Sequence, residues 1–179
     1  MTLIEILIVI SILGVLIGLV SINLQSDQRQ NRTSAEQLTA RINHATLLAT
    51  LRGNPMGLSL STQGYEFWQL ARHNRTSTEN VNPQWLLADQ RGLGRHQLKA
   101  NQQFQLQLDQ TTIALKQTLP TGPQLFFPAS GELPDFLISL NNGPNSHGFR
   151  VTADPSRFQA IITSDTGTTL AASATEPGP

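Results

Sequence analysis

The chain contains no cysteine, and charged residues occupy only 13% of its 179 positions. The absence of thiols excludes disulfide bonds and every metal site that needs a cysteine ligand. Lysine and arginine together number 12, as do aspartate and glutamate, so the formal net charge is zero. A chain without net charge has no global field that would attract nucleic acid or anionic lipid.

The sequence also lacks a recognisable catalytic or metal-binding pattern. Ser130 lies in Ala-Ser-Gly, without the flanking glycines of a nucleophile elbow. Gly92-Leu93-Gly94 is not followed by the third glycine of a phosphate loop. None of the histidines has the spacing of a metal site: His44, His73, His96 and His147. We therefore expect no enzyme activity, no cofactor, no metal and no small-molecule substrate.

A third absence is the lack of charge near the N-terminus. No residue from Ile6 to Ser26 is charged, and Leu, Ile and Val fill most of these positions. About 20 apolar residues are the length that a helix needs to cross a bilayer. Glu5 precedes this run, and a carboxylate at that depth in lipid costs about 2.5 kcal/mol or more unless it is paired. The sequence therefore predicts a transmembrane helix in which Glu5 has a function.

Two ordinary interpretations compete for this segment. A secretory signal peptide needs a basic n-region, a shorter apolar core and a small-residue cleavage site. Here no Lys or Arg precedes Arg29, the apolar run is too long, and no such site follows it. A simple membrane anchor fits the apolar run but leaves Glu5 unexplained.

The helix is expected to continue beyond the apolar run. Apolar residues recur in steps of three and four at Ala35, Leu38, Ile42, Ala45 and Ala49, which is typical of one face of an amphipathic helix. Gly53-Asn54-Pro55 ends this pattern. The sequence thus predicts one helix of about 50 residues and roughly 75 Å in length, whose second half packs on a folded domain.

After Pro55 the apolar period changes to two, which is typical of strands. The alternation predicts hairpins from 56–60 with 65–70 and from 104–108 with 112–116, the latter around Asp109-Gln110. Residues 71–83 and 91–101 are expected to be irregular. Further short strands are expected at 85–87, 124–127, 136–140, 147–152 and 158–163. Short strands separated by turn residues indicate an antiparallel sandwich or a pair of sheets.

The N-terminal residues Met1-Thr2-Leu3-Ile4-Glu5, with the apolar run that follows, resemble the mature N-terminus of type IV pilins and type II secretion pseudopilins. This resemblance implies that a prepilin peptidase removes a leader peptide and that Met1 becomes N-methylated. It also implies a pilin-like α+β fold, in which a long N-terminal α-helix packs on an antiparallel β-sandwich domain. The chain departs from the commoner pattern in having Met1 instead of Phe and Ile22 instead of Pro.

Glu5 suits a role in subunit assembly. A carboxylate buried in a filament core needs a cation, since an unpaired buried charge is strongly unfavourable. The only cation near an N-terminus of this composition is the α-amine. We therefore expect Glu5 to face the Met1 amine of an adjacent subunit, where the pair sets the axial register.

The globular part resembles the GspH branch of this superfamily. The resemblance rests on motifs at 52–58, 64–67, Trp85 and 126–132, on the strand at 136–140, and on Gly167. It implies a minor pseudopilin near the tip of the periplasmic pseudopilus, which takes part in protein secretion across the outer membrane. The implied partners are other pseudopilins (GspG, GspI, GspJ and GspK-like subunits), the prepilin peptidase and the inner-membrane assembly platform.

This resemblance and the composition together suggest four segments. Residues 1–25 form a transmembrane or filament-core helix, and 26–54 its amphipathic continuation. Residues 55–170 form a β-rich domain in the periplasm, and 171–179 a disordered tail. The expected location is the bacterial inner membrane, crossed once, with later incorporation into the pseudopilus.

The alternative function is that of a minor pilin of a type IV pilus, either structural or DNA-binding in DNA uptake. Two loops concentrate basic residues: Arg72, His73 and Arg75 in one, and Arg91, Arg95, His96 and Lys99 in the other. Binding to phosphates requires several clustered Lys or Arg residues. Because the net charge is zero and no basic tail is present, nucleic acid is not expected as a partner.

Overall fold

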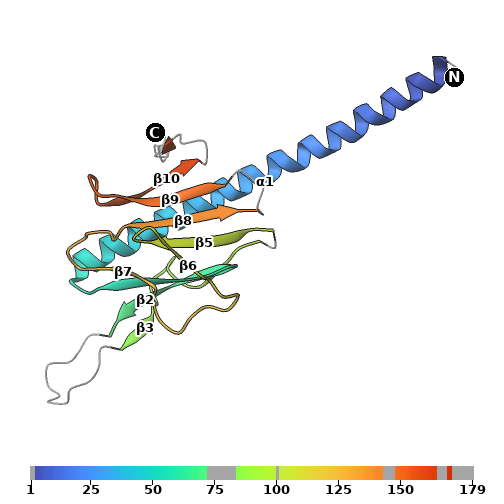
Figure 1. Ribbon diagram of the computed structural model, residues 1–179. Coiled ribbons are helices and arrows are strands. Elements are labelled where there is room, and N and C mark those ends of the chain that lie inside the picture. Colours follow the sequence, from blue (N-terminus) through green and yellow to red (C-terminus); the bar gives the residue numbers. More distant parts are fainter. Residues whose placement is uncertain (1–2, 72–83, 100, 143–147, 165–168, 171–179) are drawn as a thin grey trace, which may run out of the picture.

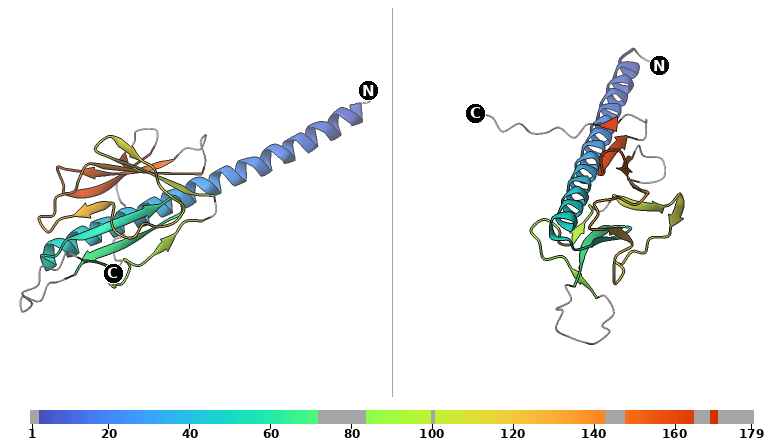
Figure 2. Two further views of the ribbon diagram at one scale, coloured as in Figure 1. Left: turned by 60° about the horizontal axis from the view of Figure 1, so that its bottom comes forward. Right: turned by 90° about the vertical axis from the view of Figure 1, so that its left-hand side faces the viewer.

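The computed structural model describes residues 3–71, 84–99, 101–142, 148–164 and 169–170, with 15–27 and 169–170 described by their backbone alone. A single helix, α1 (Leu3–Arg52), spans 50 residues (Figure 1). Its N-terminal half projects from the domain, and its C-terminal half lies against the sheets (Figure 2). The single long helix predicted from the sequence is confirmed.

Gly53 and Asn54 end the helix as their residue types predict. Gly53 has a φ of 59°, the left-handed conformation that costs glycine least. Its N–H donates to the Thr50 carbonyl at 3.3 Å, and the Asn54 N–H donates to the Ala49 carbonyl at 3.0 Å. These two bonds form a Schellman motif, which satisfies carbonyls that the helix end would leave without partners.

The predicted apolar face of the helix is buried. Ala35, Leu38, Ile42, Ala45 and Ala49 each have 0% exposed surface. Three of the five are alanines, so the helix axis can lie close to the strands beneath it.

The first sheet contains β1 (Met56–Ser61), β2 (Gly64–Leu70), β3 (Trp85–Leu87), β4 (His96–Gln97) and β7 (Leu125–Phe127). The strand order is β3-β2-β1-β7, and β4 also pairs with β2. β1 and β2 form the first predicted hairpin, with Leu58 opposite Phe67.

The second sheet contains β5 (Gln103–Leu108), β6 (Thr111–Ile113), β8 (Phe136–Asn141), β9 (Phe149–Asp154), β10 (Gln159–Ser164) and β11 (Thr169–Leu170). Its order is β11-β10-β9-β8-β5-β6. Asp109 and Gln110 join β5 to β6 with φ values of 46° and 64°. Two positive φ values in a two-residue loop are typical of a type I′ hairpin turn, whose twist matches that of the strands.

Aromatic side chains from both sheets meet in the core. The rings of Tyr65 and Phe104, on β2 and β5, lie 5.9 Å apart, and the rings of Phe67 and Phe127 lie 6.5 Å apart. The predicted pair of antiparallel sheets and the α+β class are confirmed.

The structure differs from the sequence-based expectation at short elements. The segment 91–101, expected to be irregular, contains β4, and β11 was not predicted. Two-residue strands such as these carry too little alternation to be recognised in the sequence. Most of the expected 71–83 loop and the whole 171–179 tail lie outside the described residues.

Two side-chain amides, those of Asn43 and Gln102, form hydrogen bonds that join α1 to the domain outside its apolar face. The Asn43 amide donates to the Ala160 carbonyl at 3.1 Å and accepts from the Ala160 N–H at 2.7 Å. Nearer the projecting half, the Gln102 amide donates to Asn31 Oδ1 at 2.7 Å, and the Ser34 hydroxyl donates to Gln102 Oε1 at 3.2 Å. The Asn43 side chain thus makes with Ala160 of β10 the pair of backbone hydrogen bonds that a neighbouring strand would make.

Replacing Asn43 by alanine should destabilise the domain, because it leaves the buried Ala160 N–H and carbonyl without partners. We expect a loss of about 2 kcal/mol in the free energy of unfolding, measured by urea denaturation of the full chain in mild detergent. Asn43→Asp keeps the acceptor but sets a carboxylate oxygen against the Ala160 carbonyl, so it should not restore the lost stability. His44→Ala, at the exposed neighbouring position, is the control. An Asn43→Ala chain as stable as this control would contradict the assigned role.

Candidate functional site

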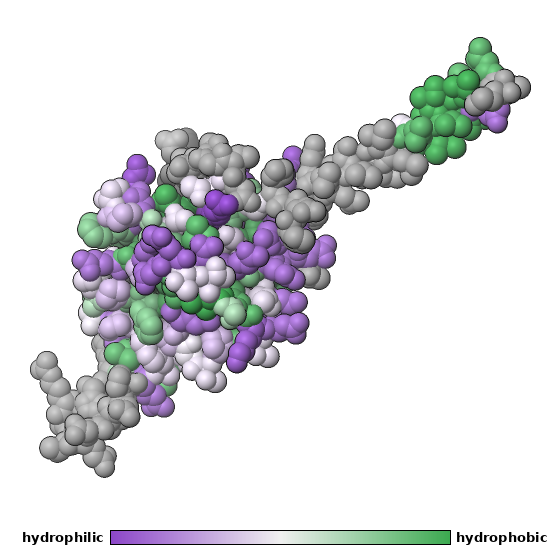
Figure 3. All heavy atoms as spheres, in the orientation of Figure 1, coloured by the Kyte–Doolittle hydropathy of each residue, from purple (hydrophilic) through white to green (hydrophobic). Residues whose placement is uncertain are grey.

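The first candidate site is the apolar surface of the projecting half of α1. Among the side chains described there, from Leu3 to Gly14, every large apolar one is exposed: Leu3, Ile4, Ile6, Leu7, Ile8, Val9, Ile10, Ile12 and Leu13. Figure 3 shows this continuous apolar surface at the end of the helix, away from the domain. An exposed apolar surface of this extent marks a site of interaction with protein or membrane.

These side chains cover the whole circumference of the helix. Ile6 to Ile10 are consecutive and between 48% and 61% exposed. Because successive residues of a helix point about 100° apart, five in a row leave no polar face. A helix that is apolar all round needs apolar surroundings on every side, and a groove on one partner does not supply them.

Glu5 is the acidic residue in the first turn of this helix. A carboxylate there is favoured by the partial positive charge of the helix N-terminus. The other predicted site residue, Met1, lies outside the described residues, so the expected pairing of Glu5 with a neighbouring amine stays a prediction. Over the described residues, no helix meets the length and apolarity required of a membrane span.

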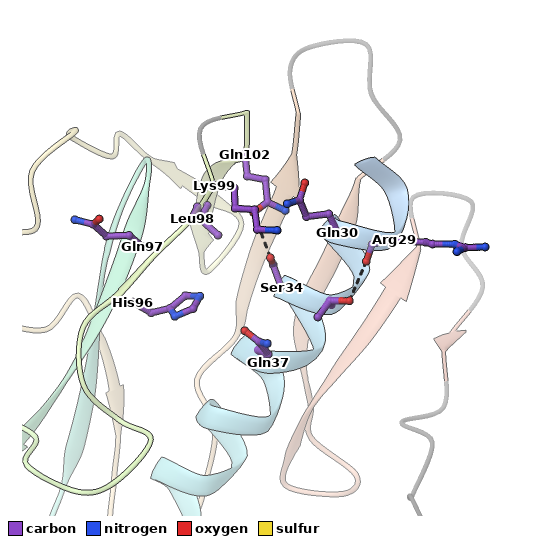
Figure 4. Close-up of a pocket in the computed structure, with 10 residues that line it drawn as sticks. Arg29, Gln30, Ser34, Gln37, His96, Gln97, Leu98, Lys99 and Gln102 are labelled. Atoms are coloured by element: carbon purple, nitrogen blue, oxygen red, sulfur yellow. Dashed lines mark hydrogen bonds between the residues drawn. The ribbon is translucent and has the colours of Figure 1, made fainter. Parts of the chain in front are cut away.

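A polar cleft of about 620 Å³ lies where α1 leaves the domain. The helix supplies one wall with Arg29 and Gln37, and the connection around β4 supplies the other with His96 and Lys99. In Figure 4, His96 points from the β4 side toward the helix, whereas Arg29 extends away from the other labelled residues. No carboxylate is among the described residues that line the cleft.

Behind His96 lies a buried tyrosine. The Tyr65 ring is 5.1 Å from the His96 ring, and the Arg41 guanidinium carbon lies 5.6 Å from its centroid. Burial raises the pKa of Tyr65 from 10.0 to about 12, and the Arg41 charge opposes this shift. Burial, together with Arg41, lowers the pKa of His96. His96 is therefore neutral at physiological pH, and Lys99 and Arg29 carry the positive charge around the cleft.

A second hollow, of about 560 Å³, is more apolar. Its wall includes Leu47 of α1 and Phe158 from the β9–β10 turn, which are 55% and 58% exposed. Phe158 has a φ of 53°, which is rare for a bulky side chain.

The basic residues singled out in the sequence do not form one patch within the described residues. Arg95 pairs with the buried Glu66 at 3.1 Å, and His96 packs on Tyr65. Arg91 and Lys99 are exposed. Arg72, His73 and Arg75 lie outside the described residues.

The remaining sequence candidates are dispersed. Ser130 is exposed in a turn, and His44 is exposed on α1, while His147 lies outside the described residues. Among the residues that the structure describes, no three His, Asp or Glu side chains come together as metal ligands.

Sequence reasoning missed both hollows. Leu47 and Leu51 recur four residues apart outside the buried face of α1, a signal that could have marked an exposed apolar surface. No local pattern in the sequence marked the polar cleft, because its two walls, which come from Arg29 to Gln37 and from His96 to Gln102, lie at least 59 positions apart in the chain.

Comparison with known proteins bears on both the family and the fold. The family model described as "Type II transport protein GspH" matches residues 34–167. No curated protein matches the chain.

Several solved structures share the architecture. Two are of the minor pseudopilin EpsH from the type II secretion system of Vibrio cholerae. One is 22% identical with a TM-score of 0.53, covering 82% of this chain and 99% of that one. The other is 21% identical with a TM-score of 0.57, covering 75% and 93%. The solution structure of Escherichia coli GspH is 17% identical with a TM-score of 0.51, covering 85% and 93%. These likenesses show that the fold is shared.

Alkaline titration of the full chain should reveal the buried tyrosine. The chain contains a single tyrosine, so the ultraviolet absorbance of tyrosinate reports on Tyr65 alone. Because the folded pKa is raised from 10.0 to about 12, burial of neutral Tyr65 contributes fully to stability below the unfolded pKa. That contribution is lost as the pH rises through the folded pKa.

The native midpoint should therefore lie well above 10.0, and it should return to the ordinary value in urea. Arg41→Gln removes the opposing charge and should move the native midpoint higher still. A native midpoint at the ordinary tyrosine value would show that the side chain is not buried as described.

Proposed function

This chain belongs to the GspH family of type II transport proteins, and on this premise we propose that it is a minor pseudopilin, a non-enzymatic subunit near the tip of the periplasmic pseudopilus of type II secretion. The observation that supports this most directly is the projecting half of α1, whose exposed apolar side chains surround the helix. Such a helix is suited to assembly, because it cannot remain in water.

The subunit would first be held in the inner membrane by this helix, with its β domain in the periplasm. The assembly platform would then move it into the filament, where the helices of neighbouring pseudopilins replace lipid around α1. Lipid and neighbouring helices are both apolar, so the exchange costs little free energy. The other minor pseudopilins and the major one are the proposed neighbours, and Met1 would be N-methylated after prepilin peptidase cleavage.

Glu5 would favour the filament over the membrane in this transfer. A carboxylate at the depth of lipid is unfavourable unless it is paired, and in the filament the Met1 amine of a neighbouring subunit would pair with it. Such a pair contributes more to specificity than to net stability, because only one axial register brings the two groups together. Glu5 would therefore decide whether the subunit is incorporated.

Glu5→Gln should leave membrane insertion intact and abolish efficient incorporation, because the amide has the shape of the carboxylate without its charge. Secretion and co-purification with the other minor pseudopilins are the measurements, made in cells that express this chain as their only GspH-like subunit. Glu36→Gln is the matched control. Glu36 is a carboxylate on the same helix, is exposed, and pairs with Arg32 at 2.8 Å.

The Glu36→Gln chain should secrete normally. Normal secretion and co-purification by the Glu5→Gln chain would show that Glu5 has no role in assembly. Failure of that chain to enter the membrane would show that the carboxylate acts at insertion instead.

A further inference from the structure

The first sheet has an open edge along β3 (Figure 1). In the order β3-β2-β1-β7 this strand comes last on its side, and β2 is the one described strand that pairs with it. β4 pairs with β2 at Gly64 and Tyr65, further along the same strand, so it does not cover β3. An open edge presents backbone N–H and carbonyl groups that can pair with another strand.

Two hydrogen bonds show which backbone groups around β3 are already used. The Ala71 N–H donates to the Gln84 carbonyl at 2.8 Å, and the Ala88 N–H donates to the Phe67 carbonyl at 2.9 Å. Opposite residues in antiparallel strands alternate between pairs that exchange hydrogen bonds and pairs that do not. Every second residue from Gln84 to Ala88 is therefore bonded to β2.

Trp85 and Leu87 occupy the positions between. They lie opposite Leu70 and Trp68, at pairs that exchange no hydrogen bonds, so their N–H and carbonyl groups point away from β2. Within the described part of the chain, no residue forms a backbone hydrogen bond with these groups. The edge therefore offers donors and acceptors to a partner.

The side chains of β3 also leave the edge open to pairing. Leu86 and Leu87 are 44% and 56% exposed. Proteins discourage pairing at such edges with charged residues, with proline or with very short strands. β3 uses only the last of these, since its three residues include neither a charge nor a proline.

The two faces of this edge differ. On one face the centre of the Trp85 ring lies 5.6 Å from that of the Phe126 ring, and Phe126 is 51% exposed. On the other face Leu86 and the residue opposite it, Gln69, line a third hollow of about 330 Å³ beside the end of α1. Successive side chains of a strand point to opposite faces. An added strand would therefore place its side chains alternately on the aromatic pair and over this hollow.

We propose that β3 pairs with an extended segment of a different minor pseudopilin, which adds a strand to the first sheet. The proposal rests on the proposed function, which supplies other minor pseudopilins as neighbours. β3 lies at the end of the domain where α1 stops, because the Asn54 amide donates to the Leu70 carbonyl at 2.9 Å and Leu70 lies opposite Trp85. With the N-terminal half of α1 directed toward the membrane, this end is directed toward the tip.

The chemistry of the edge selects an extended chain as the partner. Trp85 and Leu87 present their backbone groups in a line, two residues or roughly 7 Å apart. A strand repeats its donors and acceptors at the same interval, whereas the backbone groups of a helix are already bonded within the helix. The exposed Leu86 and Leu87 side chains favour apolar residues in the added segment. Main-chain pairing of this kind joins many complexes in which a peptide extends an open sheet.

Hydrogen exchange tests the pairing directly. The full chain is purified in mild detergent, alone and after co-expression with the other minor pseudopilins of its system, and exchange is measured for single amides. The amides of Trp85 and Leu87 should exchange at least about tenfold more slowly in the complex, because the added strand would supply acceptors for them. The Leu86 amide is the control, since its position opposite Gln69 bonds it to β2 in both samples.

The variant Leu87→Pro tests the same edge by removing one donor. It removes no bond to β2, and proline is tolerated at an edge where the N–H faces away from the sheet. The amount of the chain that co-purifies with the other minor pseudopilins should fall about tenfold. Leu87→Thr is the matched control, because it keeps the N–H and suits a strand, so it should co-purify better than Leu87→Pro. A raised titration midpoint of Tyr65 in each variant would show that the domain is folded.

A complex in which the Trp85 and Leu87 amides exchange as fast as in the chain alone would overturn the pairing while leaving the assembly role in place. Co-purification of the Leu87→Pro chain at the level of the unaltered chain would also overturn it. Protection of the two amides that increases with the concentration of the chain alone would show that a second copy, and not another pseudopilin, occupies the edge. If the unaltered chain formed no complex, the proposed function itself would be contradicted, together with the pairing.

Discussion

The structure depends on one helix whose two halves need different surroundings. From Ala35 to Ala49 the buried face of α1 packs on the sheets of its own domain, whereas from Leu3 to Leu13 its apolar side chains have no partner within the described chain. The hydrophobic effect therefore acts on the two halves in different ways. It fixes the second half within the subunit, and it favours apolar surroundings for the first half, which lipid or other helices would supply.

Much of this could be predicted from the sequence, because the relevant signals are local. The steps between Ala35 and Ala49 follow the helical repeat, and all five residues of that face are fully buried. The helix end at Gly53 has the backbone conformation that glycine favours, and Asp109 in the hairpin turn is a residue type enriched at positive φ. Glu5 also stood out, because a charge beside a long apolar run is costly in lipid, but its role stays a prediction.

The remainder could not be predicted, because it depends on residues far apart in the chain. The strand order places β7 beside β1 and β8 beside β5, and no periodicity encodes such neighbours. Asn43 gave no signal of its own, since its role exists only where Ala160 of β10 comes beside it. The polar cleft was missed for the same reason, because α1 and the β4 connection form it together.

Because the two halves of α1 make separate contacts, the proposed transfer from membrane to filament could leave the domain unchanged. The contacts that fasten the helix to the domain begin at Asn31 and Ser34, and the exposed apolar side chains end at Leu13 among those described. Since the side chains from Leu3 to Leu13 take no part in the core, exchanging lipid for neighbouring helices around them removes no contact that stabilises the β sheets.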